Sequence, residues 1–594
     1  MKKKLICTLL CLALCLSLLP MAALATEPVE TAEEEPVVPV SELETEPVPE
    51  TEPVAETEPA AETDPTLEQP GIEKLFVGNV EVVKEYALVQ AADENGTWTY
   101  DMETNTLTLK GADITETERY YGIEARGDLN LVLENDNTIH CASYYGIYVS
   151  GTLTITGSGS LTADGSDFGI ATGKALNIGD RVTISAASGA VTSGSSYGIK
   201  AGDGVNCLGV VTISDYAKVT AIGGTAPDKS YGLYSDDTVT ISGNAQLTTT
   251  ADEGLNSYGI YALSAVVLND CAKVTTTGDS NVGGYGGSYG IRTTRMIINN
   301  GSLTAVSAPS LVASVGIYCS RFECNGGIVT ARGSDSETDG SWGIAAHNNV
   351  NINGGMITAI SGNAASSSCG FQMSDNSGST CLMAVNGGTI TAKSGSAGQT
   401  LGLDASALTI NNGFITATAG QAEDFSWGIR VASILTVNGG TIIATGNSAS
   451  MFSYGILASS DSTIDSATVT ATGNSASSSY GIRTFGALSI SNSIVTALSG
   501  KAKTESCGIV ASFGNLNIVD SFVTATAGEA ELSDGIACPD GEYTTSGGKI
   551  IETNVSEIIE QSKEILSYWK DKFKPVQNNF PAKFPTLWKD FFRK

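Results

Sequence analysis

The stretch WGIRVASILTVNGGTIIA (residues 427–444) contains three short apolar runs, separated by corners rich in Gly, Asn and Ser. The same order of runs and corners returns in residues 343–359 and 481–497. Apolar and polar residues alternate within each run, which is typical of β-strands, and no ten-residue helical pattern lies between the runs. Each unit therefore predicts three short strands that together form one turn of a repeating structure.

A tripeptide marks this repeat: usually an aromatic residue, sometimes Cys, then Gly, then Ile. The mark glycines are 23 to 34 residues apart, with 27 the commonest interval, and stand at positions 122, 146, 169, 198, 232, 259, 290, 316, 343, 370, 402, 428, 455, 481, 508 and 535. A period in this range indicates a solenoid, because one unit must stack on its neighbours to bury its apolar side. We predict an all-β fold, a right-handed parallel β-helix of about sixteen coils with three short strands each, followed by a short C-terminal helix. At roughly 4.8 Å per coil it would be about 75 Å long.

The chain divides into five segments. Residues 1–25 contain a basic start, an apolar run and the small-residue site Ala23-Leu24-Ala25, which indicates a secretory signal peptide. An uncleaved anchor helix would need a longer apolar run. Residues 26–72 are rich in Pro, Glu and Thr, so we expect an extended, disordered acidic stalk. Residues 73–110 are expected to cap the solenoid, residues 111–550 to form the β-helix repeats, and residues 551–594 to form a helix and a basic aromatic tail.

The last segment has two interpretations. Asn554 can cap a helix that continues to Lys574, and Pro575 ends it. We favour a helix that covers the open end of the solenoid. The alternative is contact with a cell-wall polymer or a membrane surface through residues 551–594, since basic and aromatic residues follow the helix.

The net charge argues against one class of partner, and the cysteine positions indicate which thiols are buried. The formal net charge of −32 argues against a nucleic-acid partner, which would need a basic face. Nine cysteines follow the predicted signal peptide; the number is odd, and most of them lie in different coils. Cys369 and Cys507 occupy the aromatic slot of the repeat and read as small buried hydrophobic residues. Cys319 and Cys324 share one coil and form the one pair worth testing for a disulfide.

Strand alternation predicts which side chains face inward. If the Ile after each mark glycine points inward, regular alternation turns the aromatic residue before the glycine inward too. An internal ring stack would then contain Tyr197, Tyr258, Tyr289, Trp342, Trp427, Tyr454 and Tyr480. A sugar-binding aromatic strip is the alternative for these residues. A second, narrower internal stack is expected from the Ala of the recurrent Thr-Ala pair, at positions 163, 305, 359, 417, 471 and 525.

The residue two positions after each mark glycine must face outward. In the N-terminal half this column contains aromatic and cationic residues that we take as candidate glycan-binding residues: Tyr148, Lys200, Tyr234, Tyr261, Arg292 and Tyr318. Exposed aromatic rings offer flat apolar faces with a polar tip, and their spacing is comparable to the length of a sugar ring. The alternative is that Tyr and Arg simply favour exposed strand positions.

The repeat architecture, together with the runs WTYD (98–101), TNTLTL (104–109) and GDLNLVLE (127–134), resembles exported bacterial, Firmicutes-like, carbohydrate-binding β-helix proteins of pectate-lyase-like architecture. The resemblance covers about residues 73–550. It implies binding to plant or host polysaccharide and allows structural Ca²⁺, with no other cofactor. Relatives of this architecture include lyases and adhesins, so the fold alone does not decide the function.

Catalytic chemistry has little support in the sequence. The two histidines, His140 and His347, lie far apart in the coil order. Asp335, Glu337 and Asp339 form the densest acidic cluster and are a weak candidate for Ca²⁺; a solvated acidic turn is the favoured alternative. No carboxylate pair at glycosidase spacing can be recognised.

We therefore expect a secreted, non-catalytic protein, associated with the cell surface, that presents a long β-helix face to polysaccharide. Two alternatives remain open. One is an adhesin or structural surface protein that binds host protein or mucin, and the other is a polysaccharide lyase.

Overall fold

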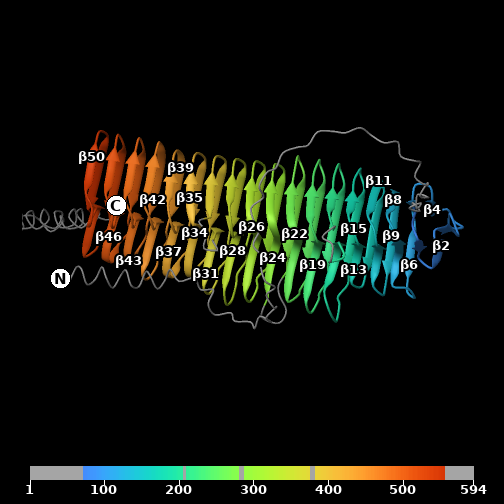
Figure 1. The fold of residues 1–594 in the computed structure, drawn as a ribbon. Helices are drawn as coiled ribbons and strands as arrows, with labels where there is room; N and C mark the ends of the chain where they lie inside the picture. The colour runs from blue at the N-terminus through green and yellow to red at the C-terminus, as the bar shows by residue number, and fades with distance from the viewer. Residues whose placement is uncertain (1–70, 205–208, 280–285, 375–380, 555–594) are drawn as a thin grey trace, which may run out of the picture. The chain divides into compact units, whose positions relative to one another are not determined.

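A computed structural model describes residues 71–204, 209–279, 286–374 and 381–554. These residues form a parallel β-solenoid of about sixteen turns with three strands per turn, which confirms the predicted fold class (Figure 1). The described residues contain no helix, and so none long and apolar enough to cross a membrane. The predicted signal peptide and most of the predicted stalk lie outside the described residues, as do the predicted C-terminal helix and tail except for residues 551–554, which belong to a strand.

The first strand of each turn contains the mark glycine. These strands are β7 (Tyr121–Arg126), β10 (Tyr145–Val149), β13 (Phe168–Thr172), β16 (Ser196–Ala201), β19 (Lys229–Ser235), β22 (Asn256–Leu268), β24 (Gly287–Ile298), β26 (Ala313–Cys324), β28 (Gly340–Ala346), β31 (Ser367–Met373), β34 (Ala397–Ala405), β37 (Ala422–Val431), β40 (Phe452–Ala458), β43 (Ala476–Thr484), β46 (Ala502–Ala511) and β49 (Leu532–Ala537). The second strands run from β8 (Leu129–Glu134) to β50 (Tyr543–Ser546). The third strands run from β9 (Asp136–Cys141) to β51 (Lys549–Asn554) and form a separate sheet.

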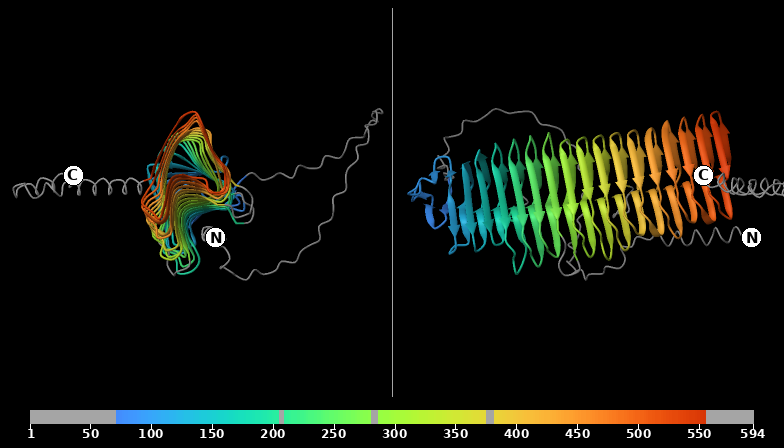
Figure 2. Two further views of the ribbon diagram at one scale, coloured as in Figure 1. Left: turned by 90° about the vertical axis from the view of Figure 1, so that its left-hand side faces the viewer. Right: turned by 180° about the vertical axis from the view of Figure 1, so that it is seen from behind.

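Equivalent residues of successive turns pair in register, so each side-chain type forms a column along the solenoid. In the turn of β43, β44 (Leu488–Ser491) and β45 (Ile494–Leu498), the inward residues Ile482, Ile490 and Val495 have no exposed surface. The predicted alanine column is also inside: all six of its alanines are fully buried. Seen end-on, the turns lie over one another, so one apolar core runs through the stack (Figure 2).

The N-terminal end of the solenoid is closed by antiparallel strands. Strand β1 (Lys74–Val77) pairs antiparallel with β7, the first strand of the first full turn. Strands β2 (Val80–Lys84) and β3 (Ala87–Leu88) continue from β1 as a meander, and β4 (Trp98–Asp101) pairs with β5 (Thr106–Lys110). A parallel stack would otherwise expose a row of unpaired backbone groups at this end.

The predicted inward position of the mark aromatics is wrong. Strand pairing skips the mark glycine: Tyr145 pairs with Phe168 and Ile147 with Ile170, while the glycine between them has no partner. At this point the alternation changes phase, so the glycine and the following Ile both face inward. A Cβ on Gly481 would lie 2.7 Å from the amide nitrogen of Leu498, across the interior. The aromatic residue before the glycine therefore faces outward.

A serine precedes the mark residue in most turns, and it supports this orientation. Ser288 is fully buried, and its hydroxyl donates to the carbonyl of Gly278 at 2.9 Å and accepts from the amide of Ala308 at 2.9 Å. Serines at the equivalent positions 196, 230, 257, 314, 341, 368, 426, 453, 479 and 506 are also fully buried. A column of small polar residues thus occupies the inner corner, where a ring would have no space.

A ladder of asparagine side chains runs along the corner between the second and third strands. Each Nδ2 donates to the Oδ1 of the asparagine one turn earlier at 2.7–2.8 Å, through residues 269, 299, 325, 353, 386, 411 and 438. The Gly-Gly that follows most of these residues makes the corner possible. Gly440, for example, has φ +87°, and a Cβ there would lie 2.6 Å from the carbonyl oxygen of Gly413.

The cysteines agree with their predicted burial. Cys369 and Cys507 are almost fully buried in the aromatic slot. Cys319 and Cys324 are buried and free, so the disulfide considered for them is absent. Burial also raises the pKa of the Cys319 thiol.

Candidate functional site

Two columns of outward side chains lie beside each other along the first strands. One column contains the residues just before the mark glycines, and the other contains the residues two positions after them. Because the alternation changes phase at the glycine, both columns face outward and their rings touch. The ring centroids of Tyr258 and Tyr261 are 5.0 Å apart, and those of Tyr231 and Tyr234 are 5.2 Å apart. We call these the outer aromatic columns.

The first column forms a continuous ring stack in the N-terminal half. Successive centroids are 4.5–5.2 Å apart and the rings are within 16° of parallel, through Tyr121, Tyr145, Phe168, Tyr197, Tyr231, Tyr258 and Tyr289. Each ring inside this series covers the faces of its neighbours, and Tyr258 is only 3% exposed. The rings in the interior of the stack therefore present little surface to solvent, which suits packing better than sugar stacking.

The predicted glycan residues all lie in the second column and are half-buried. Tyr234 and Tyr261 stack on each other with centroids 5.6 Å apart. Lys200 Nζ lies 5.5 Å from the Tyr197 ring, and the Arg292 guanidinium lies 5.1–5.9 Å from four tyrosine rings. These cation–π contacts bind the two columns together. Lys200 and Arg292 are thus engaged within the protein.

The local electrostatics reflect this packing. Burial raises the pKa of Tyr258 to about 12, against the opposing effect of Arg292. The guanidinium of Arg292 also donates to the Tyr258 hydroxyl at 3.3 Å. Tyr318 packs against His347, with ring centroids 4.7 Å apart, so the column ends on a titratable ring.

A second aromatic group lies in the C-terminal half. There the second column has no aromatic residue, as the sequence shows, but the first column does. Trp427, Tyr454 and Tyr480 form a stack, and Phe425 and Phe452 lie alongside it. Arg430 and Arg483 lie over Trp427 and Tyr480 at 5.3 Å and 4.5 Å from the ring centroids.

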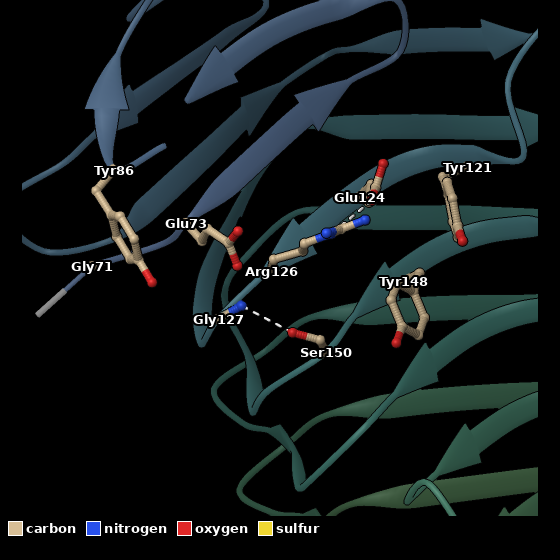
Figure 3. Close-up of a pocket in the computed structure, with 9 residues that line it drawn as sticks. All are labelled: Gly71, Glu73, Tyr86, Tyr121, Glu124, Arg126, Gly127, Tyr148 and Ser150. Carbon is tan, nitrogen blue, oxygen red and sulfur yellow. Dashed lines mark hydrogen bonds and ion pairs between the residues drawn. The ribbon is translucent and has the colours of Figure 1, made fainter. Parts of the chain in front are cut away.

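A pocket of ≈ 400 Å³ lies where the outer aromatic columns meet the N-terminal cap (Figure 3). We call it the end pocket. Two of its rings, Tyr121 and Tyr148, belong to the outer aromatic columns, and a third, Tyr86, comes from the cap. The remaining lining residues are Gly71, Glu73, Glu124, Arg126, Gly127 and Ser150.

Tyr121 differs from the other rings of its stack. It is the first ring, with Tyr145 stacked on one face and the tilted ring of Tyr148 at 5.5 Å. Among the described residues no further ring or cation lies on it. The end pocket is thus the place where the long stack ends and an aromatic ring can meet a ligand.

Glu124 organises the charges of the end pocket. It is 3% exposed, and its carboxylate lies 3.3 Å from Lys74 Nζ, 3.0 Å from a terminal nitrogen of Arg119 and 3.4 Å from Arg126 Nε. A buried carboxylate needs such partners to remain stable. Arg126 is thereby oriented on the pocket wall, and Glu73 supplies a second, exposed carboxylate (Figure 3).

Tyr86 reaches the pocket from a strained turn. Glu85 and Tyr86 join β2 to β3 with φ angles of 49° and 63°, both in the left-handed region. Residues with a Cβ reach this region at a cost of roughly 1–2 kcal/mol each. Asn-Gly would fit this hairpin turn without that cost. The strained pair places the Tyr86 ring opposite Glu73 and Arg126 (Figure 3).

The structure brings only one predicted glycan residue, Tyr148, into the end pocket. Glu124 stands in the same column as Tyr148 but is not among the predicted glycan residues, and Tyr121 is one of the mark aromatics for which regular alternation predicts an inward position. Glu73 and Tyr86 lie outside the repeats. Asp335, Glu337 and Asp339 are not brought together: the described residues contain no group of three or more acidic, Cys or His side chains placed to hold a metal. Instead the Asp335 carboxylate accepts from the amide of Asn363 at 2.7 Å.

The fold and this site define a parallel β-solenoid with outward aromatic columns and a pocket at its N-terminal end. Comparisons with protein-family models, curated proteins and solved structures found no match to the chain.

Proposed function

We propose that this chain is a secreted, non-catalytic carbohydrate-binding protein of the cell surface, and that the end pocket binds part of a polysaccharide. The observation that carries the proposal is the composition of the end pocket. Aromatic rings and charged groups converge in a volume of ≈ 400 Å³, within the range of small-molecule sites. Aromatic rings pack on the apolar faces of sugars, and carboxylates and Arg bind sugar hydroxyls.

The charges favour binding over catalysis. Glu124 is nearly buried and engaged by three cations, which suits a group that orients Arg126. Glycoside hydrolysis needs a second carboxylate at a defined separation, with one of the pair free to exchange a proton. Only Glu73 remains for that role in this pocket.

The sequence supports the proposed location and partner. The signal-like residues 1–25 support export, and the basic aromatic residues 551–594 offer contact with a cell wall or membrane surface. The net charge of −32 supports a partner other than nucleic acid. We take plant or host polysaccharide as the partner.

Glycan-array binding followed by calorimetry tests the proposal. We expect Tyr86→Ala and Tyr121→Ala to weaken binding of the best glycan at least ten-fold. Tyr216→Ala changes an exposed tyrosine outside the end pocket; it serves as the matched control and should leave the affinity unchanged. Circular dichroism confirms that each variant is folded.

Three results would contradict different parts of the proposal. Absence of binding to any glycan would reject the function. Loss of binding in Tyr234→Ala/Tyr261→Ala, with Tyr86→Ala unaffected, would move the site from the end pocket to the middle of the columns. Release of unsaturated uronides from pectin would replace binding by lyase activity.

A further inference from the structure

A second pocket, of ≈ 290 Å³, lies along the C-terminal halves of β24 and β26, which extend into the second-strand position of their turns, and along the second strand of the next turn. We call it the flank pocket. Its polar residues are Arg295 from β24, Arg321 and Glu323 from β26, and Asn349 and Asn351 at β29 (Val350–Ile352). None of these residues belongs to the outer aromatic columns or the end pocket.

Arg295 and Arg321 are direct register partners in the parallel pair of β24 and β26. Neighbouring strands lie about 4.8 Å apart, so the two cationic side chains start side by side. Like charges in this arrangement are unfavourable. Arg430 and Asp404, by contrast, place opposite charges side by side on adjacent turns.

Neither arginine has an ion-pair partner within the described residues. The carboxylates form seven close ion pairs there, and none involves Arg295 or Arg321. Glu323 lies nearby but accepts a 3.0 Å hydrogen bond from Asn325 Nδ2. In a chain with twice as many acidic as basic residues, 64 against 32, two adjacent unpaired arginines are unexpected.

Asn349 adds a hydrogen-bond donor beside the two arginines. Asn349 follows Arg321 in the same column, one turn further along. Its Oδ1 accepts from the amide of Leu382 at 3.3 Å, which leaves its Nδ2 group as the donor. Guanidinium groups bind planar or tetrahedral oxyanions through two parallel hydrogen bonds.

We propose that the flank pocket binds an oxyanion, with Arg295 and Arg321 as its ligands and Asn349 as an additional donor. The shared chemistry is a sulfate, phosphate or carboxylate group. Such a group can be free in solution, or it can be attached to an acidic polysaccharide. The proposal holds independently of what the end pocket binds.

The test compares Arg295→Gln/Arg321→Gln with a matched control, Arg332→Gln/Lys393→Gln. The control removes the same two charges from exposed positions on the sheet of third strands. Calorimetry with sodium sulfate, sodium phosphate, chondroitin sulfate and polygalacturonate provides the probes. We expect the flank-pocket variant to lose at least ten-fold in affinity and the control to lose less than two-fold.

The probes also distinguish the source of the anion. Binding of the polymers but not of millimolar inorganic anions supports a glycan-borne group, while inorganic binding at the same arginines supports a free anion. Equal losses in both double variants would overturn the proposal, since they would indicate a general charge effect. Unchanged affinity in Arg295→Gln/Arg321→Gln would also overturn it.

Two further measurements distinguish loss of the anion site from misfolding of the variant. Arg321→Lys keeps the charge but loses the paired donors, so we expect a partial loss of affinity. The melting temperature of Arg295→Gln/Arg321→Gln should equal or exceed that of the parent protein, because the like-charge contact is removed. A marked decrease would show that the arginines serve stability and would contradict the proposal.

Discussion

Arg430 and Asp404 meet across two adjacent turns and form a bidentate ion pair. The Nε and a terminal nitrogen of the guanidinium each donate a 2.8 Å hydrogen bond to a different carboxylate oxygen. The Asp404 side chain is 6% exposed and that of Arg430 28%. The guanidinium also lies over the Trp427 ring, so the ion pair connects the C-terminal aromatic group to β34, the strand that contains Asp404.

Removal of one partner should destabilise these turns. Arg430→Met leaves a buried carboxylate without its counter-charge. We expect the free energy of unfolding to fall by about 3 kcal/mol, which is the low end for a buried pair because Arg430 is part-exposed. Hydrogen exchange at β34 and β37 measures the loss, since solenoid turns respond locally. Lys501→Met breaks the exposed pair with Glu529 and is the control. It should cost less than about 1 kcal/mol. Equal effects of the two substitutions would contradict the assigned role.

The inward mark glycines should not tolerate a side chain. In Gly481→Ala the new Cβ would meet the carbonyl oxygen of Gly508 at 2.6 Å and the amide nitrogen of Leu498 at 2.7 Å. Both neighbours are backbone atoms, so we expect the free energy of unfolding to fall by about 1–3 kcal/mol, as for other overpacked sites. Thermal unfolding measures it. Gly179→Ala is the control, because its Cβ would meet only side-chain oxygens, the nearest at 3.1 Å. If Gly481→Ala melts like the parent, the inward orientation is wrong.

His347 should titrate below its ordinary range. Burial, and secondarily Arg292, hold the pKa of His347 below the usual 6.5. Above pH 6.5 the ring is neutral in both folded and unfolded chains, so it has no effect on stability. As the pH falls below 6.5 the unfolded chain binds the proton first, and the folded state loses stability until the pH passes the folded pKa.

Histidine-selective NMR provides the measurement, because the chain contains only two histidines. His140→Gln assigns the signals. The melting temperature of the parent should fall relative to that of His347→Gln as the pH decreases from 7 to 5. Titration of His347 at or above pH 6.5 would refute the prediction.

The period of the sequence was sufficient to predict the solenoid, because stacking requires equivalent strands to pair. The prediction of faces failed at one residue. The prediction continues regular alternation through the mark glycine, whereas in the structure the alternation changes phase there and the glycine has no strand partner. The buried serine two residues before the glycine was the available signal, since a ring and a serine cannot both occupy the inner corner.

The end pocket could not be predicted from the repeats. Glu73 and Tyr86 come from the N-terminal cap, whose antiparallel strands have no period to align. Their position next to Tyr121 depends on the pairing of β1 with β7 and on two left-handed residues in one turn. The flank pocket differs in this respect: Arg295 and Arg321 each stand five residues after a mark glycine, 290 and 316, so the repeat alone places them in one column on adjacent turns.

The asparagine ladder makes the number of turns adjustable. Each internal asparagine of the row donates to one neighbour and accepts from the next, so every junction between turns presents the same two groups. Duplication or deletion of one whole turn in this region would rejoin an unchanged donor to an unchanged acceptor. Proteins built this way can therefore change their length by recombination in steps of about 4.8 Å, while both ends and the pocket at the cap stay intact.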